Sequence, residues 1–278
     1  MTPPRSKTYA TWVGLGMASL TACAGPSIRS DVQRVRELSR VEHLARVAEL
    51  EVDPVAAEDT SRLLDGELDA DTAVRVALLN NRELRATLRE LGVARGHLMQ
   101  AGALPNPVVE VEVMPERNSR LELRVEWDIT SAVLAPRRAR AVEPELAAAR
   151  FRVAGAVVDL GYRVRVAFYA VQAAQQRLEV AQRMLDAYAA GRDAARAIFD
   201  AGNSAELDLA SQEVAYERAR ITVAELELDA ATAREALQRL LGAHGEDTGW
   251  TVTGTLPDVP ASVTLPEELE TSALQASL

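Results

Sequence analysis

The sequence has little of what enzymes and metal-binding proteins need. Among its 278 residues Cys23 is the only cysteine, which excludes an intrachain disulfide and a thiolate metal cluster. The three histidines, His43, His97 and His244, lie far apart, and none belongs to a pair with metal-ligand spacing. A glycine-rich phosphate loop and a recognisable nucleophile motif are also missing. The sequence therefore predicts a protein that is not an enzyme and holds no metal or cofactor.

Positive charge is scarce as well. The chain carries 41 acidic and 31 basic residues, which gives a formal net charge of −10. Because DNA and RNA are polyanions, this balance opposes binding to them. We therefore expect no nucleic-acid partner.

A short basic segment at Arg5 and Lys7 precedes a mostly apolar run from Tyr9 to Leu20. A transmembrane helix needs about 20 apolar residues, so this run predicts a signal peptide over residues 1–22. Because Cys23 follows directly, the segment resembles a bacterial lipoprotein signal, in which the cysteine is diacylated and holds the mature protein on a membrane. Ala24 stands where such signals use Asp for inner-membrane retention, so the outer membrane is the expected location. An ordinary secretory signal with a chance cysteine is the alternative.

Two stretches of alternating sequence, Val108 to Met114 and Arg120 to Ile129, interrupt a chain that otherwise has the composition of long helices. Alternation with period two predicts strands that have one apolar and one charged face. The intervening residues 115–119 supply turn chemistry, so an antiparallel hairpin is expected. A lone hairpin is barely stable in water and needs strands from elsewhere in this chain or from other copies.

These two faces fit a membrane barrel, whose outer side touches lipid and whose lumen holds water. A small soluble hairpin packed on a helix is the alternative. The lipid-facing set would be Val109, Val111, Val113, Leu121, Leu123, Val125 and Trp127. The lumen-facing set would be Glu110, Glu112, Glu122, Arg124 and Glu126, which would favour cations or merely solvate the strand face.

The remaining segments have helical periodicity. A helix is expected over 139–201, and its length of about sixty residues corresponds to roughly 90 Å. Shorter helices are expected at 69–100, with Asp69 or Asp71 as N-cap, and at 205–241, with Gly242 as C-terminal cap. The heptad positions in the long helix are Val157, Leu160, Val164, Ala167, Val171, Ala174, Leu178, Ala181, Leu185 and Tyr188. Those in the last helix are Ala210, Val214, Ile221, Ala224, Leu228 and Ala231.

The combined length of the two shorter helices nearly equals that of the long one. This relation predicts a mainly α fold in which one long helix lies antiparallel to two stacked shorter ones, with the β-hairpin at one extremity. Before these elements, apolar residues recur at intervals of three from Val32 to Val47. This N-terminal segment, 23–66, is expected to be a helix or arm along the outside of the helices, or else a flexible tether.

Several motifs resemble those of the TolC family of outer-membrane efflux proteins. They occur in order over about Leu68 to Gly242, and each is loose alone. They are the segment 73–86, AVRVALLNNRELRA; 101–107, AGALPNP; 136–140, PRRAR; 199–209, FDAGNSAELDL; and the ending at 237–242.

The resemblance implies a trimeric conduit, with a β-barrel pore in the outer membrane and an α-helical tunnel across the periplasm. It implies docking through the helical tips onto a periplasmic adaptor protein and an inner-membrane pump. The tip of this chain would comprise Gly202, Asn203, Ser204, Leu207 and Asp208. A non-transporting coiled-coil lipoprotein with a scaffolding role is the alternative function.

Members of this family contain two strand-and-helix repeats, and this chain carries one, over 67–248. Residues 249–278 are expected to be a linker, from Gly249 to Pro260, followed by the start of a second repeat near Leu265 to Leu274. Three copies of one hairpin would supply about half the expected barrel, too few strands to enclose a channel. We therefore expect a truncated sequence, or a wall completed by more copies or by a separate second half.

Overall fold

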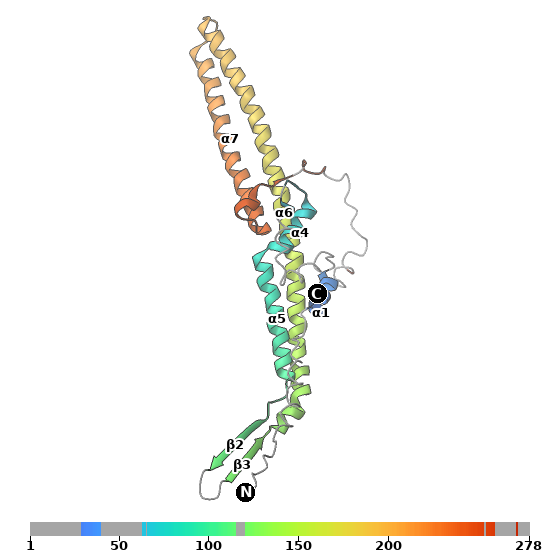
Figure 1. Cartoon of the computed structure of the whole chain (residues 1–278). Helices are drawn as coiled ribbons and strands as arrows, with labels where there is room; N and C mark the ends of the chain where they lie inside the picture. The colour runs from blue at the N-terminus through green and yellow to red at the C-terminus, as the bar shows by residue number, and fades with distance from the viewer. Residues whose placement is uncertain are drawn as a thin grey trace, which may run out of the picture.

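The computed structural model describes residues 29–39, 63–64, 66–114, 120–252, 254–258 and 271. These residues form an elongated, mainly α-helical rod with a β-hairpin at one end (Figure 1). The helix α6, Ile129–Asp200, has 72 residues and a length of about 110 Å. Its first part packs against α5, Arg82–Gly102, and its second part against α7, Glu206–Leu241. The predicted arrangement of one long helix beside two shorter ones is confirmed.

The start of α6 differs from the prediction. The helix begins at Ile129 and continues through Pro136 and Pro144, whereas the sequence prediction began it at residue 139. Asp128 is the N-cap, because its Oδ1 accepts a hydrogen bond from the Ser131 backbone N–H at 2.9 Å. Hydrogen bonds from Ser131 lower the pKa of the Asp128 carboxyl. This cap also ends the strand character three residues before the predicted end at Ile129.

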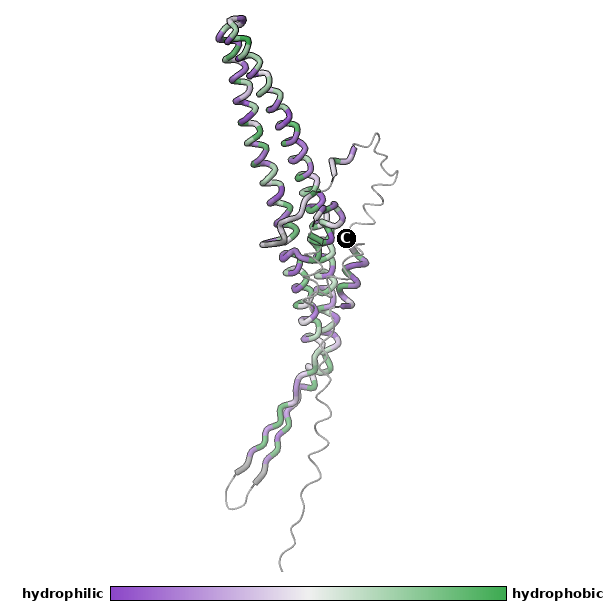
Figure 2. The backbone as a smooth tube through the Cα atoms, turned by 45° about the horizontal axis from the view of Figure 1, so that its top comes forward, coloured by the Kyte–Doolittle hydropathy of each residue, from purple (hydrophilic) through white to green (hydrophobic). Residues whose placement is uncertain are grey.

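The hairpin consists of β2, Val108–Met114, and β3, Arg120–Glu126, paired antiparallel. Val109 lies opposite Val125 and Val111 opposite Leu123. The predicted hairpin is therefore confirmed, with its second strand ending at Glu126. In Figure 2 both strands alternate between hydrophobic and hydrophilic residues along their length.

The helix predicted over 69–100 is two helices in the structure. Asp69 caps α4, Ala70–Asn80, through a hydrogen bond from the Thr72 N–H at 2.6 Å, and hydrogen bonds from Thr72 lower its pKa. At Asn81 the backbone turns to an extended conformation with ψ 122°, and α5 follows. The Asn81 Oδ1 accepts a hydrogen bond from the Leu84 N–H at 3.0 Å and so caps α5. The helix is interrupted here because the Asn81 side-chain amide also forms a hydrogen bond to a residue outside α4 and α5.

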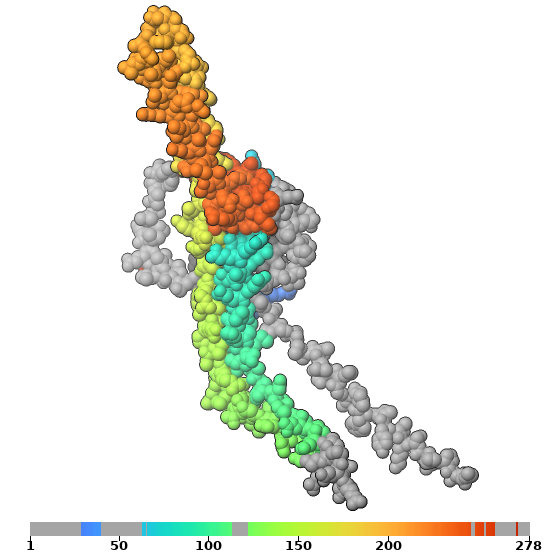
Figure 3. Space-filling view, turned by 90° about the vertical axis from the view of Figure 1, so that its left-hand side faces the viewer, coloured from blue at the N-terminus to red at the C-terminus, as the bar shows by residue number. Residues whose placement is uncertain are grey.

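That outside partner is the end of α7. The Asn81 Nδ2 donates to the Leu240 carbonyl oxygen at 2.9 Å, and the Asn80 Nδ2 donates to the Gly242 carbonyl oxygen at 2.9 Å. Gly242 has a φ of 68°, as expected for a helix-terminating glycine. The end of α7 is therefore fixed against the corner between α4 and α5, where it forms a lobe directly above α5 (Figure 3).

The segment after α7 packs onto the rod, although the sequence prediction treated residues 249–260 as a linker. After a 3-10 turn, Gly245–Thr248, the strand β4, Thr251–Val252, pairs in parallel with β1, Glu67–Leu68. Trp250, which lies between the 3-10 turn and β4 in the sequence, is fully buried. The Arg234 guanidinium lies 4.0 Å from the centre of the Trp250 ring and donates to the Thr248 carbonyl oxygen at 2.7 Å. The predicted second-repeat start, near residues 265–274, lies outside the described residues except for Thr271.

The buried apolar core occupies the middle of the rod. It comprises α4, the first part of α5, the end of α7 and the predicted heptad positions of α6 from Val157 to Val171, with Ala174 and Ala181 beyond them. Among the described residues, no helix combines the length and apolarity that a bilayer-spanning helix needs. The N-terminal helix α1, Arg29–Ser39, packs on α6 with Val32 and Val35 buried. The other residues predicted for the N-terminal arm lie outside the described part, apart from 63–64 and 66.

The two glycines that end α6 and α7 offer a matched test of the α7 junction. Gly202 and Gly242 both have left-handed backbones, with φ 76° and 68°. A Cβ at Gly202 would meet nothing within 4 Å, whereas one at Gly242 would lie 2.7 Å from the Asn80 carbonyl oxygen. We expect Gly202→Ala to lower the free energy of unfolding by about 1–2 kcal/mol and Gly242→Ala to lower it further. Urea titrations followed by helical circular dichroism measure both, and equal losses would contradict the tight junction.

Candidate membrane hairpin and helical tip

The apolar face of the hairpin is fully formed and exposed. Residues directly opposite each other in an antiparallel pair point to the same side of the sheet. The register therefore gathers Val109, Val111, Leu123 and Val125 on one face, and each of these side chains is 56–64% exposed. Val113 and Leu121 are opposite each other in the backbone, but their side chains lie outside the described residues. Such a contiguous apolar face predicts contact with something other than water.

The other face of the hairpin is charged and mostly acidic. The Arg124 guanidinium lies 3.5 Å from the Glu110 carboxylate and 3.3 Å from the Glu122 carboxylate. Glu112 lies opposite Glu122 in the register, and Glu126 ends the strand. By the register, two arginines, Arg120 and Arg124, share this side of the sheet with four glutamates, so its net charge is negative. By the register, the five residues predicted to face a lumen share one side of the sheet, where Glu126 lies opposite Val108.

The base of the hairpin is tied to the chain that enters it. The Trp127 indole N–H donates to the Pro105 carbonyl oxygen at 2.8 Å, which joins the segments on both sides of the two strands. Beyond this tie, no described residue outside the hairpin pairs with either strand. The hairpin is therefore held at its base only, and both of its edges are open within the described part of the chain.

The opposite end of the rod is a tight helical turn. The Asn203 N–H donates to the Ile198 carbonyl oxygen at 3.0 Å, and the Gly202 N–H donates to the Phe199 carbonyl oxygen at 2.8 Å. These two bonds form a Schellman motif, and it needs the positive φ that Gly202 adopts. The predicted turn residues therefore lie together at one extremity of the rod, as Figure 1 shows.

The start of α7 leaves one large apolar side chain free at this tip. The Ala205 N–H donates to the Asp208 carboxylate at 3.2 Å, so Asp208 holds the first turn of α7. Leu207 is 76% exposed, the largest exposed fraction of any large apolar residue that the structure describes. The Ser204 hydroxyl is covered and has no hydrogen-bond partner among the described residues. The tip thus presents an apolar residue at its end, as expected of a contact point.

Polar contacts hold the α6–α7 pair together near this tip. The Arg192 guanidinium lies 4.1 Å from the centre of the Tyr216 ring, and Arg196 forms an ion pair with Glu213. The hydrogen bond between Arg192 and Asp193 raises the pKa of the arginine. The buried apolar residues, by contrast, end at Ala181 and at Val223 toward the tip, and each of these is still 8% exposed. The distal pair is therefore a polar and more open coiled coil.

The apolar heptad of α7 does not lie against α6. The residues that α7 buries in the rod are Val223, Leu237 and Leu241. The predicted heptad row points away from α6, and its large members Val214, Ile221 and Leu228, together with Leu207 seven residues earlier, are 50–76% exposed. The periodicity is real, but it belongs to a second face of α7 that the described residues leave uncovered. We refer to Leu207, Val214, Ile221 and Leu228 as the outer row.

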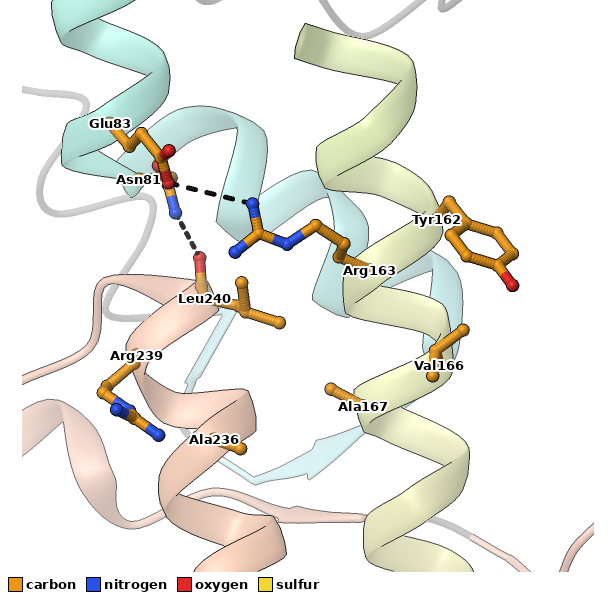
Figure 4. A pocket seen from close by; sticks show the side chains of 9 residues that line it. All are labelled: Asn81, Glu83, Tyr162, Arg163, Val166, Ala167, Ala236, Arg239 and Leu240. Carbon is orange, nitrogen blue, oxygen red and sulfur yellow. Dashed lines mark hydrogen bonds and ion pairs between the residues drawn. The ribbon is translucent and has the colours of Figure 1, made fainter.

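A groove of about 590 Å³ lies where α6 meets the α4–α5 corner and the end of α7. In Figure 4 Arg163 reaches from α6 toward Glu83, 3.8 Å away, whereas Tyr162 projects away from the groove. Asn81 and Leu240 close its far side through their hydrogen bond. No cluster of three or more His, Cys, Asp or Glu side chains that could hold a metal occurs among the described residues. The groove therefore resembles a joint between helices more than a reaction site.

The sequence prediction missed one buried polar site. Asp31 of α1 has no exposed surface and contacts both Arg95 of α5 and Arg150 of α6. These residues are far apart in the sequence, and no local pattern marks them as partners. The only available signal was an acidic residue one position before the buried Val32. The predicted lipidation site, Cys23, lies outside the described residues.

Comparisons with known proteins place this geometry in context. A sequence profile described as outer membrane efflux protein matches residues 73–243. The cobalt-zinc-cadmium resistance protein CzcC of Cupriavidus metallidurans is 31% identical over 218 residues, which cover 76% of this chain and 52% of CzcC. The chain therefore spans about half the length of this curated relative.

Solved structures show the same fold. A structure of CusC matches with a TM-score of 0.57 and 21% identity over 72% of this chain and 49% of that chain. The outer-membrane channel OprN matches with a TM-score of 0.57 and 22% identity over 72% of this chain and 48% of that chain. At these identities the likeness concerns the fold alone.

Two neighbouring positions of α7 test which face is buried within the chain. Val223 is 8% exposed and Ile221 is 60% exposed, and both are β-branched apolar residues. We expect Val223→Asn to lower the free energy of unfolding by roughly 2 kcal/mol, because an amide would be buried, and Ile221→Asn to change it by less than about 0.5 kcal/mol. Thermal melts of the detergent-dispersed single chain measure the difference, and an equal loss in both variants would contradict the assigned face.

Proposed function

The chain belongs to the outer membrane efflux protein family, and from this premise we propose that it forms part of the wall of an efflux channel. The channel would be a passive conduit that carries substrate across the periplasm and the outer membrane. The family consists of channels and not enzymes, in agreement with the non-enzymatic character expected from the sequence. The observation that carries the proposal is the two-faced hairpin at one end of a rod of about 110 Å.

The hairpin would supply two strands of a β-barrel in the outer membrane. Its apolar face, with Val109, Val111, Val113, Leu121, Leu123, Val125 and Trp127, would touch lipid. Its charged face, with Glu110, Glu112, Glu122, Arg124 and Glu126, would line the lumen. Because a barrel has no free edges, the open edges of β2 and β3 support pairing with strands of other copies or of a second repeat. A homotrimer would suffice if the full-length chain carries that second repeat.

The helices would form a periplasmic tunnel. The outer row of α7 is an apolar heptad on the side of the helix that faces away from α6, which supports a further helix packed alongside. In a wall of helices packed side by side, each helix has two neighbours. Among the described residues, α6 is one such neighbour of α7. The alternative, a scaffolding lipoprotein, would need neither the second helix neighbour nor a lipid-compatible strand face.

The far end of the rod would meet the rest of the efflux system. We assign Gly202, Asn203, Ser204, Leu207 and Asp208 to the site that contacts a periplasmic adaptor protein, with an inner-membrane pump behind it. The exposed Leu207 at the turn supports this assignment. Divalent metal cations are the first cargo to test, since CzcC is described as a cobalt-zinc-cadmium resistance protein and the charged strand face is acidic.

The N-terminus would anchor the protein. The sequence from Arg5 to Cys23 supports removal of a signal peptide over residues 1–22 and acylation of Cys23, which would place the chain at the bacterial outer membrane. A diacylated cysteine would anchor the protein stably, because two acyl chains bind a bilayer far more strongly than one. The hairpin would be a second, separate attachment to the same membrane.

Trp127 reports whether the hairpin enters lipid. It is 47% exposed, whereas Trp250 is fully buried in the rod and serves as an internal reference. In vesicles made with brominated phospholipid, we expect fluorescence quenching that disappears in Trp127→Phe. Quenching by aqueous iodide with no effect of the brominated lipid would contradict membrane insertion and favour the scaffold.

Leu207 reports whether the tip meets an adaptor. With a photoreactive amino acid in place of Leu207, we expect cells to yield an adduct that mass spectrometry identifies as a periplasmic adaptor. The same substitution at Glu227, which is exposed on α7 but far from the tip, serves as the control. An adduct at both positions, or at neither while efflux continues, would remove the tip assignment.

A further inference from the structure

A carboxylate with no exposed surface joins three helices near the hairpin end of the rod. The Asp31 Oδ1 accepts hydrogen bonds from the Arg150 Nε at 3.0 Å and the Arg150 Nη2 at 2.6 Å. Its Oδ2 accepts from the Arg95 Nε at 2.7 Å and lies 2.6 Å from the Arg95 Nη2. Arg95 also donates to the Ser30 hydroxyl at 3.3 Å. Every contact that fixes this carboxylate therefore comes from α5 or α6.

These contacts determine where α1 sits. A helix of 11 residues is marginal by itself in water, so its stability must come from packing. Val32 and Val35 supply apolar contact, but apolar contact alone could slide along the rod. A buried charge tolerates one location only, because moving it away from its partners leaves it desolvated and unpaired. Asp31 is thus a positional lock between α1 and the α5–α6 pair.

The lock lies on the hairpin side of the rod, about 30 Å along α6 from its first residue, Ile129, and much farther from the tip. Arg95 precedes the last residue of α5, Gly102, by about two turns, which is about 10 Å. From Arg150 to Asp200 at the tip end of α6 the distance is about 75 Å. Figure 1 likewise shows α1 beside the half of α6 that leads to the hairpin.

The segment between Cys23 and α1 is short. Residues 24–28 are all that separates Cys23 from Arg29. Even fully extended, this stretch spans only about 20 Å, enough to pass the end of α5 and to come within about 10 Å of the base of the hairpin, and far too little to reach the tip. An acyl chain on Cys23 could therefore enter a bilayer only at the hairpin end of the rod.

We propose that α1, locked by Asp31 between Arg95 and Arg150, is a clamp that holds the lipid anchor beside the base of the hairpin and thereby sets how deeply the hairpin enters the membrane. This proposal rests on the acylation of Cys23 assigned above. With the clamp intact, the acyl chains and the hairpin are two membrane attachments at a fixed separation. With the clamp released, the residues of α1 lengthen the tether between Cys23 and the rod, and the anchor no longer constrains the hairpin.

The test compares Asp31→Asn with Glu37→Gln in the acylated, membrane-reconstituted protein. Both variants lose one negative charge on α1, but Glu37 is exposed and pairs only with Arg34 of the same helix. We expect Asp31→Asn to raise the amide exchange rate of residues 29–39 about a hundredfold or more, because a broken buried ion pair frees the helix. We also expect depth-dependent quenching of Trp127 by lipids brominated at different acyl carbons to broaden. Glu37→Gln should leave both readouts unchanged.

A second variant keeps the experiment decisive if Asp31→Asn disturbs folding. Ten Gly and Ser residues inserted between Pro26 and Ser27 lengthen the tether without touching the clamp. This variant should keep slow exchange in α1 yet show the broadened Trp127 depth. Unchanged α1 exchange in Asp31→Asn, or unchanged Trp127 depth in the lengthened chain, would overturn the clamp. Absence of acyl chains from the wild-type protein by mass spectrometry would instead refute the proposed acylation, while the exchange measurement would still report on the Asp31 lock.

Discussion

Two asparagine side chains determine how this chain becomes a rod. Asn81 ends one helix, begins the next and donates to the Leu240 carbonyl oxygen of α7, while Asn80 donates to the Gly242 carbonyl oxygen. A helix end normally leaves four carbonyl groups without partners, and burial of such an end is costly. The amides remove part of that cost, so α7 can end directly against the corner above α5. Without this junction, α5 and α7 would be two separate helices with no reason to share one line along α6.

The distribution of apolar residues then gives the rod a firm middle and two open ends. The core gathers where α4, α5, α6 and α7 meet, and the clamp of α1 and the packing of Trp250 add to the same region. Toward the tip, contacts between α6 and α7 become polar, and toward the other end the hairpin has no intrachain support beyond its base. Local stability follows buried contact, so both ends are the parts most easily reshaped by a partner.

Patterns that depend on neighbouring residues could be predicted from the sequence, and contacts that depend on distant residues could not. The hairpin, the caps at Asp69 and Gly242 and the end of α7 follow from local periodicity and turn chemistry. The break at Asn81 and the lock at Asp31 need partners far along the chain, which no local pattern announces. The outer row shows a further limit: a heptad reveals that a helix has an apolar face, but not which neighbour covers it. Here α7 has two faces, and the more regular one is turned away from α6.

The apolar face of the hairpin and the outer row of α7 suit different environments, and their flanking residues distinguish them. On the hairpin, Val109, Val111, Leu123 and Val125 form a face of one sheet, and the charged side chains lie on the opposite side of the backbone. Lipid can cover such a face without touching a charge. On α7, Ile221 has Glu217 and Glu225 one turn away on the same side, and a bilayer would have to bury those carboxylates. A neighbouring helix can cover the row and leave the flanking glutamates at the edge in water. The hairpin face is therefore compatible with a membrane, whereas the outer row fits an aqueous environment beside another helix.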